Sequence, residues 1–213
     1  MSCLPLGPLT INTMTLNILL TGSNRGIGLE FSKEILGAGH NLWGTARNPE
    51  KASELQELKK QYGDKLAIVK MDVSEESSVK AAFDEIKQHN VQFDVILSTA
   101  GVLQTGEYKI DDWDFDTFCK SIKTNTFGPI YVSRVFLPLV KPKGKIVALS
   151  TRVSSIADNS SGRLYSYRSS KTALNMAFKN FSIEQKDNDI QVYLLHPGNV
   201  KSDMNPGGEK DAT

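Results

Sequence analysis

The sequence predicts an α/β fold in which one doubly wound parallel sheet carries helices on both faces, as a three-layer α/β/α domain. Six short apolar runs alternate with longer segments of helical period along the 213 residues. Each glycine or polar cluster considered below follows one of these runs, which is where a parallel sheet binds its ligands. We expect one domain over residues 14–213, preceded by an irregular extension over residues 1–13, which holds two prolines and a glycine.

The individual elements follow from the apolar runs and from the residues that interrupt them. The expected strands are residues 15–20, 40–46, 66–71, 93–97, 144–149 and 190–195. The expected helices are residues 29–36, 50–61, 74–86, 115–139 with a break near residues 126–129, and 165–187. Because a helical segment separates consecutive strands, parallel pairing with right-handed crossovers is expected.

Composition excludes several classes of function. An apolar content of 39% and a charged content of 23% are those of an ordinary globular protein. The net charge of +1 gives no electrostatic reason to expect a nucleic acid or an anionic membrane as partner. Two cysteines and three scattered histidines fit neither a disulfide framework nor metal-ligand spacing, and no apolar run approaches the ~20 residues of a membrane span. We therefore expect a cytoplasmic protein without a metal.

A glycine-rich turn joins the first strand to the first helix. It follows Thr21 and reads Gly22, Ser23, Asn24, Arg25, Gly26, Ile27 and Gly28. Such a turn lets the backbone approach a pyrophosphate closely, and the helix amino terminus favours negative charge. The spacing is Gly-x-x-x-Gly-x-Gly rather than Gly-x-Gly-x-x-Gly. The turn predicts a nucleotide site in a Rossmann-like domain; the alternative is a tight turn that binds nothing.

Two arginines indicate which dinucleotide would bind. Arg47 directly follows the second strand, where the adenosine ribose of a bound dinucleotide lies, and Arg25 is in the glycine turn. A carboxylate at this point would hold a free 2′-hydroxyl, whereas a guanidinium can pair with a 2′-phosphate. The pattern favours NADP(H) over NAD(H). The other interpretation is that both arginines are solvated surface residues.

Tyr167 and Lys171 predict acid–base chemistry. Residues four apart share one face of a helix, so the phenol and the ammonium project into one site. A free phenol has a pKa near ~10, and a nearby cation lowers that pKa. The pair can therefore act as a general acid toward a developing alkoxide. Because this spacing is common by chance, an ordinary helix with a surface lysine is the alternative interpretation.

Taken together and in order, these motifs resemble the short-chain dehydrogenase/reductase family over about residues 15–204. The matching residues are Thr21, Gly22, Gly26, Gly28, Asp72, Val73, Ala100, Gly101, Asn125, Tyr167, Lys171, Pro197 and Gly198. A finer pattern resembles the C-factor-like carbonyl reductase subgroup, and its residues are Asp158, Asn159, Gly162, Tyr165, Tyr167 and Arg168.

The resemblance implies NADP(H)-dependent reduction of a small-molecule carbonyl, or the reverse oxidation of an alcohol. In that scheme Tyr167 protonates the carbonyl oxygen as hydride arrives from the nicotinamide. Lys171 lowers the pKa of the phenol and contacts the nicotinamide ribose, and Asn125 helps to hold a water that relays protons through Lys171. A hydroxyl after the fifth strand polarises the carbonyl.

The resemblance also implies further cofactor contacts. Asp72 and Val73 would border the adenine, while Ala100 and Gly101 would line the cofactor. Beyond the sixth strand come Pro197 and Gly198, and then Val200 and Ser202, which would meet the carboxamide. The family often pairs subunits through its long helices, here around residues 115–140 and 165–187, so a homodimer is one candidate assembly.

The sequence departs from the family pattern at several places. The usual catalytic serine is matched by Thr151, although Ser150 and Ser154 are alternatives for the polarising hydroxyl. The family's Asn-Asn-Ala-Gly reads Ser98, Thr99, Ala100 and Gly101. The chain stops soon after Met204, so the family's last helix and strand are expected to be lacking. These departures favour an alternative function, an NADP(H)-binding regulatory or signalling protein of the same fold with impaired catalysis.

Overall fold

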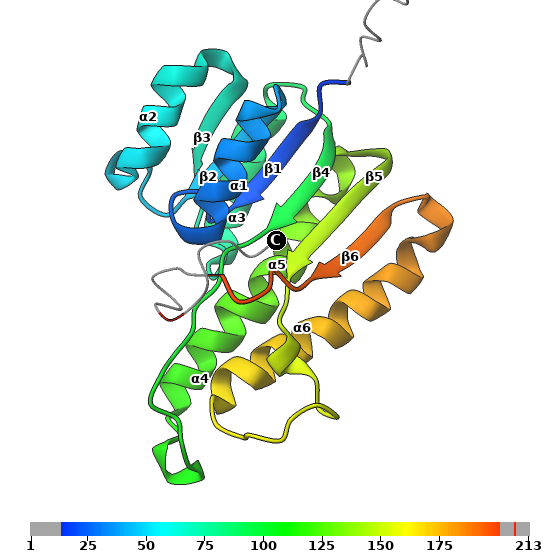
Figure 1. Ribbon diagram of the computed structural model, residues 1–213. Coiled ribbons are helices and arrows are strands. Elements are labelled where there is room, and N and C mark those ends of the chain that lie inside the picture. Colours follow the sequence, from blue (N-terminus) through cyan, green and yellow to red (C-terminus); the bar gives the residue numbers. More distant parts are fainter. Residues whose placement is uncertain (1–13, 201–206, 208–213) are drawn as a thin grey trace, which may run out of the picture.

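The computed structural model describes residues 14–200 and 207, so the expected extension over residues 1–13 lies outside the described residues. Six parallel strands form one sheet in the order β3-β2-β1-β4-β5-β6 (Figure 1). Their bounds are β1 (Asn17–Thr21), β2 (Asn41–Ala46), β3 (Leu66–Lys70), β4 (Phe93–Ser98), β5 (Val140–Leu149) and β6 (Gln191–Leu195). The predicted doubly wound parallel sheet is confirmed.

Helices cover both faces of the sheet. They are α1 (Gly26–Gly37), α2 (Ser53–Tyr62), α3 (Glu76–Lys87), α4 (Phe115–Ile122), α5 (Gly128–Phe136) and α6 (Tyr165–Glu184). Two separate apolar clusters show which helix lies on which face. One cluster joins the sheet to α1 and α2, and the other joins it to α3, α5 and α6. The three-layer arrangement follows from these two cores.

The alternation of side chains along β1 produces the two cores. Successive residues of a strand point to opposite faces of a sheet. Ile18 and Leu20 belong to the cluster under α1 and α2, whereas Leu19 belongs to the cluster under α3, α5 and α6. All three are buried, because β1 lies in the middle of the sheet. A continuous apolar run is therefore what a central parallel strand requires.

The strand order reverses at β1. The chain adds β2 and β3 on one side of β1, then returns to place β4 on the other side, with Leu19 beside both Trp43 and Ile96. The connections that leave the carboxyl ends of β1 and β4 therefore run to opposite faces. A crevice forms outside the strand ends at such a reversal, and ligands bind there in open α/β sheets.

The predicted break between α4 and α5 is a π-helical turn rather than an interruption. The turn covers Lys123–Phe127, and the helical path continues through it. Its residue Thr126 donates a hydrogen bond of 2.7 Å from its hydroxyl to the backbone oxygen of Ser170 in α6. Gly128 follows, and a Cβ there would lie 2.9 Å from Cγ2 of Val73, so the close approach of α5 to the end of β3 requires glycine. Turns of this kind are frequent at functional sites.

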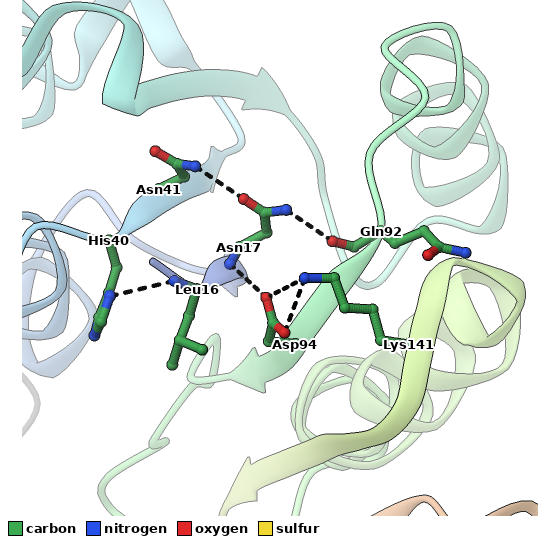
Figure 2. Close-up of polar contacts among 7 residues, drawn as sticks. All are labelled: Leu16, Asn17, His40, Asn41, Gln92, Asp94 and Lys141. Carbon is green, nitrogen blue, oxygen red and sulfur yellow. Dashed lines mark hydrogen bonds and ion pairs between the residues drawn. The ribbon is translucent and has the colours of Figure 1, made fainter. Parts of the chain in front are cut away.

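A polar network fastens the amino-terminal edge of the sheet (Figure 2). The Asp94 carboxylate accepts hydrogen bonds from the backbone amide of Asn17 at 2.8 Å and from Nζ of Lys141 at 2.8 and 2.9 Å. The side chain of Asn17 donates to the backbone oxygen of Gln92. Burial raises the pKa of Asp94, but the bonds from Lys141 and Asn17 outweigh burial and hold that pKa below its usual range.

Residues 14–200 and 207 contain neither a candidate membrane span nor a candidate metal site. No helix in that part of the chain is long and apolar enough to cross a membrane. Nor do the same residues bring three His, Cys, Asp or Glu side chains into a group that could hold a metal ion. Cys119, in α4, is a free and partly buried thiol.

Candidate active site

A cavity of about 440 Å³ lies at the carboxyl ends of β1 and β4, where the strand order reverses. Cavities of this size are typical of small-molecule sites. Most of the residues that we expected to contact a cofactor line this cavity. They are Gly22, Asn24, Arg25, Gly26, Ile27, Gly28, Arg47, Asp72, Val73, Ala100, Gly101, Tyr167, Lys171 and Pro197.

Four expected site residues do not line the cavity. Thr151 and Asn125 lie behind its wall, and each is hydrogen-bonded to a residue that does line it. Gly198 and Val200 lie beyond Pro197, outside the lining. Ser202 is outside the described residues.

The glycine turn needs glycine at two points for steric reasons. Gly22 has a φ of +69°, and a Cβ there would lie 2.9 Å from Cα of Ala100. A Cβ on Gly28 would lie 2.1 Å from the backbone oxygen of Gly22. The turn is thus folded tightly on itself and against the end of β4. Arg25, the residue that precedes α1, makes no side-chain capping bond, so the first amides of α1 keep their capacity to bind an anion.

Two threonines join the ends of β1 and β4 under this turn. The Thr99 hydroxyl donates to the backbone oxygen of Thr21 at 2.5 Å. The Thr21 hydroxyl accepts from the amides of Thr99 and Ala100, each at 3.2 Å. Thr99 therefore keeps the two strand ends together despite its departure from the family pattern. The buried hydroxyl of Ser98, by contrast, has no partner among the described residues.

Positive charge gathers at the β2 side of the cavity. Arg25 and Arg47 both line it, and both are exposed. Within the described residues neither guanidinium forms an ion pair. The carboxylate of Asp72, at the end of β3, accepts from the amide and the hydroxyl of Ser74 at 2.9 and 2.7 Å. The Asp72 carboxylate is therefore hydrogen-bonded within the turn into α3 and not to Arg25 or Arg47. Both arginines can thus bind a phosphate.

Tyr167 and Lys171 lie in α6 and line the same cavity at its β5 side. Lys171 is 5% exposed, and its Nζ donates to the backbone oxygen of Leu149 at 2.8 Å. Burial lowers the pKa of Lys171 to about 8. Burial also raises the pKa of Tyr167, and a hydrogen bond with Thr151 opposes that rise only in part.

The pKa of Tyr167 therefore differs from the sequence-based expectation. We expected the ammonium of Lys171 to lower it, but the net shift is upward. Two features explain the difference: the ammonium is bonded to Leu149, and the phenol is largely withdrawn from water, which disfavours its charged form. The phenol consequently stays protonated at neutral pH, and that is the form able to give up a proton.

Of the three candidate hydroxyls, two are engaged elsewhere. Ser154 donates to the backbone oxygen of Thr151 at 2.5 Å and accepts from Nδ2 of Asn175 at 2.7 Å. Ser150, which lines the cavity, donates to Oδ1 of Asn175 at 2.6 Å. The Thr151 hydroxyl accepts from the amide of Val153 at 3.3 Å, a bond that does not use its proton, and it is the hydroxyl that lowers the pKa of Tyr167.

Asn125 occupies the π-helical turn and is fully buried. Its Oδ1 accepts from the amide of Val102 at 2.8 Å, and its Nδ2 donates to the oxygen of Val102 at 2.8 Å and to the hydroxyl of Ser170 at 3.0 Å. A Cβ on the adjacent Gly101 would lie 3.3 Å from Oδ1 of Asn125 and 3.9 Å from Nζ of Lys171. Asn125 thus fixes the cavity wall beside Lys171.

Several lining residues escaped the sequence analysis. Most are immediate neighbours of predicted residues at strand ends. Their position at a strand end is the signal that could have indicated them. Another two, on α4 and the turn after it, are four residues apart and share one helical face. The missed residues are Thr45, Ala46, Met71, Ser74, Lys120, Thr124 and Leu149.

Several known protein sequences are similar to this chain. The profile of the family described as short chain dehydrogenase matches residues 16–212. An uncharacterized oxidoreductase of Schizosaccharomyces pombe is 32% identical over 197 residues, which cover 91% of this chain and 77% of the relative. The 1-hydroxy-2-glutathionyl-2-methyl-3-butene dehydrogenase of a Rhodococcus strain is 35% identical over 134 residues, which cover 63% of this chain and 58% of that enzyme.

Solved structures share the fold. A short-chain dehydrogenase/reductase from Burkholderia multivorans with bound NADP superposes with a TM-score of 0.86 at 28% identity, covering 93% of this chain and 86% of that one. The NADPH-bound carbonyl reductase from chicken fatty liver gives 0.84 at 30% identity, with coverages of 93% and 81%. The carbonyl reductase Sniffer of D. melanogaster gives 0.84 at 29% identity, with coverages of 91% and 85%.

Proposed function

Because the chain belongs to the short-chain dehydrogenase/reductase family, we propose that it is an NADPH-dependent oxidoreductase that reduces an aldehyde, ketone or quinone to an alcohol or hydroquinone. One observation carries the proposal. A single cavity brings the glycine turn and two exposed arginines together with the protonated phenol of Tyr167 and the buried ammonium of Lys171. The cavity can therefore bind a nucleotide and donate a proton to a substrate that lies beside it.

The residues present fit NADPH. The glycine turn has no room for side chains and offers the first amides of α1 to a pyrophosphate. Arg47 and Arg25 offer guanidiniums to a 2′-phosphate, with Met71, Asp72 and Val73 beside them. When bound, NADPH supplies the hydride that reduces the carbonyl carbon. Two of the structural relatives were solved with NADP or NADPH bound.

The chain itself supplies the proton. The phenol of Tyr167 donates to the carbonyl oxygen as negative charge develops there. Thr151, behind the cavity wall beside Tyr167, lowers the pKa of the phenol and helps to orient it. The amine of Lys171, fixed by Leu149 and with a pKa of about 8, lines the same cavity and can donate a hydrogen bond to the ribose of the nucleotide. Asn125 holds Val102 and so keeps the wall in place.

The proposal is tested by turnover and by binding in the same preparation. Purified protein should oxidise NADPH in the presence of a member of a panel of aldehydes, diketones and quinones. Tyr167→Phe should lower kcat by about 10²- to 10⁴-fold, the usual contribution of a positioned general acid. It should leave NADPH affinity within about twofold, because the phosphate-binding end is untouched. An inactive wild-type protein across the whole panel, or a fully active Tyr167→Phe variant, would refute the proposal.

One observation favours the alternative function, an NADP(H)-binding regulatory protein without turnover. The pKa of Tyr167 is raised rather than lowered, and the ammonium of Lys171 is bonded to a backbone oxygen. Tight NADPH binding with no oxidation by any carbonyl would support this second function. Rapid turnover would exclude it.

We propose a place near the C-factor-like carbonyl reductases, because residues of that pattern organise the segment before α6. Arg168 donates to the backbone oxygen of Val153 and to the hydroxyl of Ser161, and Arg152 pairs with Asp158 at 2.9 Å. A cytoplasmic location stays a prediction from composition.

A further inference from the structure

The helix that carries Tyr167 begins without a capping side chain of its own. The residue before α6 is Leu164, whose apolar side chain accepts no hydrogen bond. Leu164 and Arg163 both have positive φ values, 51° and 62°, so the chain enters the helix through a strained turn. Tyr167 is the third residue of α6, within the first turn, whose amides have no partner inside the helix. Whatever holds that turn also holds the phenol.

A carboxylate from a distant part of the chain occupies the capping position. Glu107 is 4% exposed and lies 59 positions before Ser166. Its Oε2 accepts from the amide of Ser166 at 2.9 Å, and its Oε1 accepts from the Ser166 hydroxyl. The amide of Leu164 donates to the backbone oxygen of Glu107 at 2.9 Å. A negative charge is favourable at a helix amino terminus.

Glu107 also ends a segment of the cavity wall. Val102, Leu103 and Gln104 line the cavity, and Asn125 binds Val102 through both of its backbone groups. Residues 102–107 are therefore fastened at one end to the π-helical turn and at the other to the start of α6. Figure 1 shows α4 and α6 extending beyond the sheet, with the segments that lead into them at the same end of the molecule.

We propose that Glu107 is a positioning residue, which acts through Ser166 to hold Tyr167 at the cavity and to keep the wall over residues 102–104 in register with it. This inference rests on the proposed function. Glu107 does not line the cavity, so it contacts neither the substrate nor the cofactor. Its effect is expected on the proton-transfer geometry and on the substrate side of the cavity, whereas the glycine turn and Arg47 should bind NADPH as before.

The test compares Glu107→Gln and Glu107→Ala with the wild-type protein. Loss of a helix cap makes the first turn open about two- to thirtyfold more often. Amide hydrogen exchange over residues 165–169 should accelerate by that factor in Glu107→Ala and by less in Glu107→Gln, which keeps one acceptor oxygen. In the same variants kcat should fall about fivefold or more, in the same order, and the Kd for NADPH should stay within about twofold.

Two matched controls separate positioning from general stability. Asp112 belongs to the same loop, and its carboxylate accepts from two amides of that loop, those of Tyr108 and Lys109, at 3.0 and 2.8 Å. Asp94→Asn weakens the opposite edge of the sheet. Asp112→Asn should alter neither the exchange of residues 165–169 nor kcat, and Asp94→Asn should lower stability without lowering kcat.

Failure of the inference about Glu107 and failure of the proposed function give different results. Unchanged exchange over residues 165–169 in Glu107→Ala would overturn the inference, as would accelerated exchange with an unchanged kcat and KM in an active protein. If Glu107→Ala does not fold, Ser166→Ala removes only the hydroxyl bond and supports the same comparison. If the wild-type protein shows no turnover, the proposed function fails. The catalytic part of the inference then fails with it, while hydrogen exchange still decides whether Glu107 holds the turn.

Discussion

Lys171 reaches across from α6 to the last residue of β5, and its Nζ donates to the backbone oxygen of Leu149 at 2.8 Å. Its charge forms no ion pair with a carboxylate of the described residues, and burial lowers its pKa to about 8. In the absence of a bound nucleotide the charged amine is a cost to folding. That cost has a defined pH dependence.

The first prediction is that Lys171→Met stabilises the ligand-free protein near pH 7. A lowered pKa in the folded state means that the unfolded chain holds the proton more tightly between about pH 8 and 10.5. The wild-type protein therefore gains stability relative to Lys171→Met as the pH rises through this window, by up to about 3 kcal/mol. Denaturant unfolding of both proteins at about pH 7 and about pH 10 measures the difference. Parallel pH profiles for the two proteins would contradict it.

The second prediction concerns the hydroxyl beside Tyr167. Thr151→Val keeps the shape of the side chain but removes the hydrogen bond that lowers the pKa of the phenol. The pKa of Tyr167 should rise further, so the decline of kcat at high pH should move to higher pH. We expect kcat near neutrality to fall about 10- to 100-fold, because the phenol loses a polar partner worth about 1–3 kcal/mol. A pH–rate profile of the reduction measures both effects.

Comparison variants distinguish Thr151 from its neighbours. Thr151→Ser retains the hydroxyl and should keep most of the activity. Ser154→Ala should cost about 1 kcal/mol of stability, because Asn175 loses a buried partner, with a smaller effect on kcat than Thr151→Val. If Ser154→Ala were the more damaging change for kcat, the assignment of the hydroxyl to Thr151 would be wrong.

The third prediction is that Arg47 discriminates NADPH from NADH. Arg47→Ala should weaken NADPH binding about 10- to 100-fold, since a hydrogen bond to a charged group contributes about 1.5–3 kcal/mol. NADH lacks the 2′-phosphate, so its affinity should change little. Fluorescence titrations with both nucleotides give the two Kd values. Arg134→Ala is the matched control, because Arg134 is exposed in α5 and does not line the cavity. An equal loss for both nucleotides would contradict the assignment.

The fold could be predicted from the sequence because its signals are local. Each strand is an apolar run that stops at a glycine or a polar residue, as β1 stops before Gly22. Where local signals mislead, the prediction fails. β5 begins at Val140 rather than at residue 144, because the strand continues through Pro142 and Gly144, residues that normally mark a turn. Lys143 there has a φ of +63°, and the register with β4 shifts between Phe93 and Val95.

The site was predicted only in part, and for a physical reason. Helical spacing places Tyr167 and Lys171 on one face, and the strand ends place Gly22 and Gly101 in one crevice, so these positions follow from the sequence. The direction of the pKa shift of Tyr167 depends on burial, which no local pattern reports. The role of Glu107 depends on a contact across 59 residues, and nothing in the surrounding sequence marks it.

The last prediction concerns the edge of the sheet opposite the cavity. Asp94 accepts from Asn17 and Lys141, and these bonds hold its pKa below the usual range despite burial. A lowered carboxyl pKa gives stability that is present above the unfolded pKa near ~3.9 and lost as the pH falls through the lower folded value. Asp94→Asn should therefore cost about 1.5–3 kcal/mol near pH 7.

The pH dependence makes the Asp94 prediction specific. The difference between wild type and Asp94→Asn should shrink as the pH falls below about 4, because the wild-type carboxyl then becomes protonated and resembles the amide. Denaturant unfolding of both proteins across that range measures it. The exposed Asp84 in α3 is the matched control, and Asp84→Asn should change stability by less than about 0.5 kcal/mol. A difference for Asp94→Asn that persists undiminished in acid would show that packing, rather than the charge of Asp94, fastens β1 to β4 and β5.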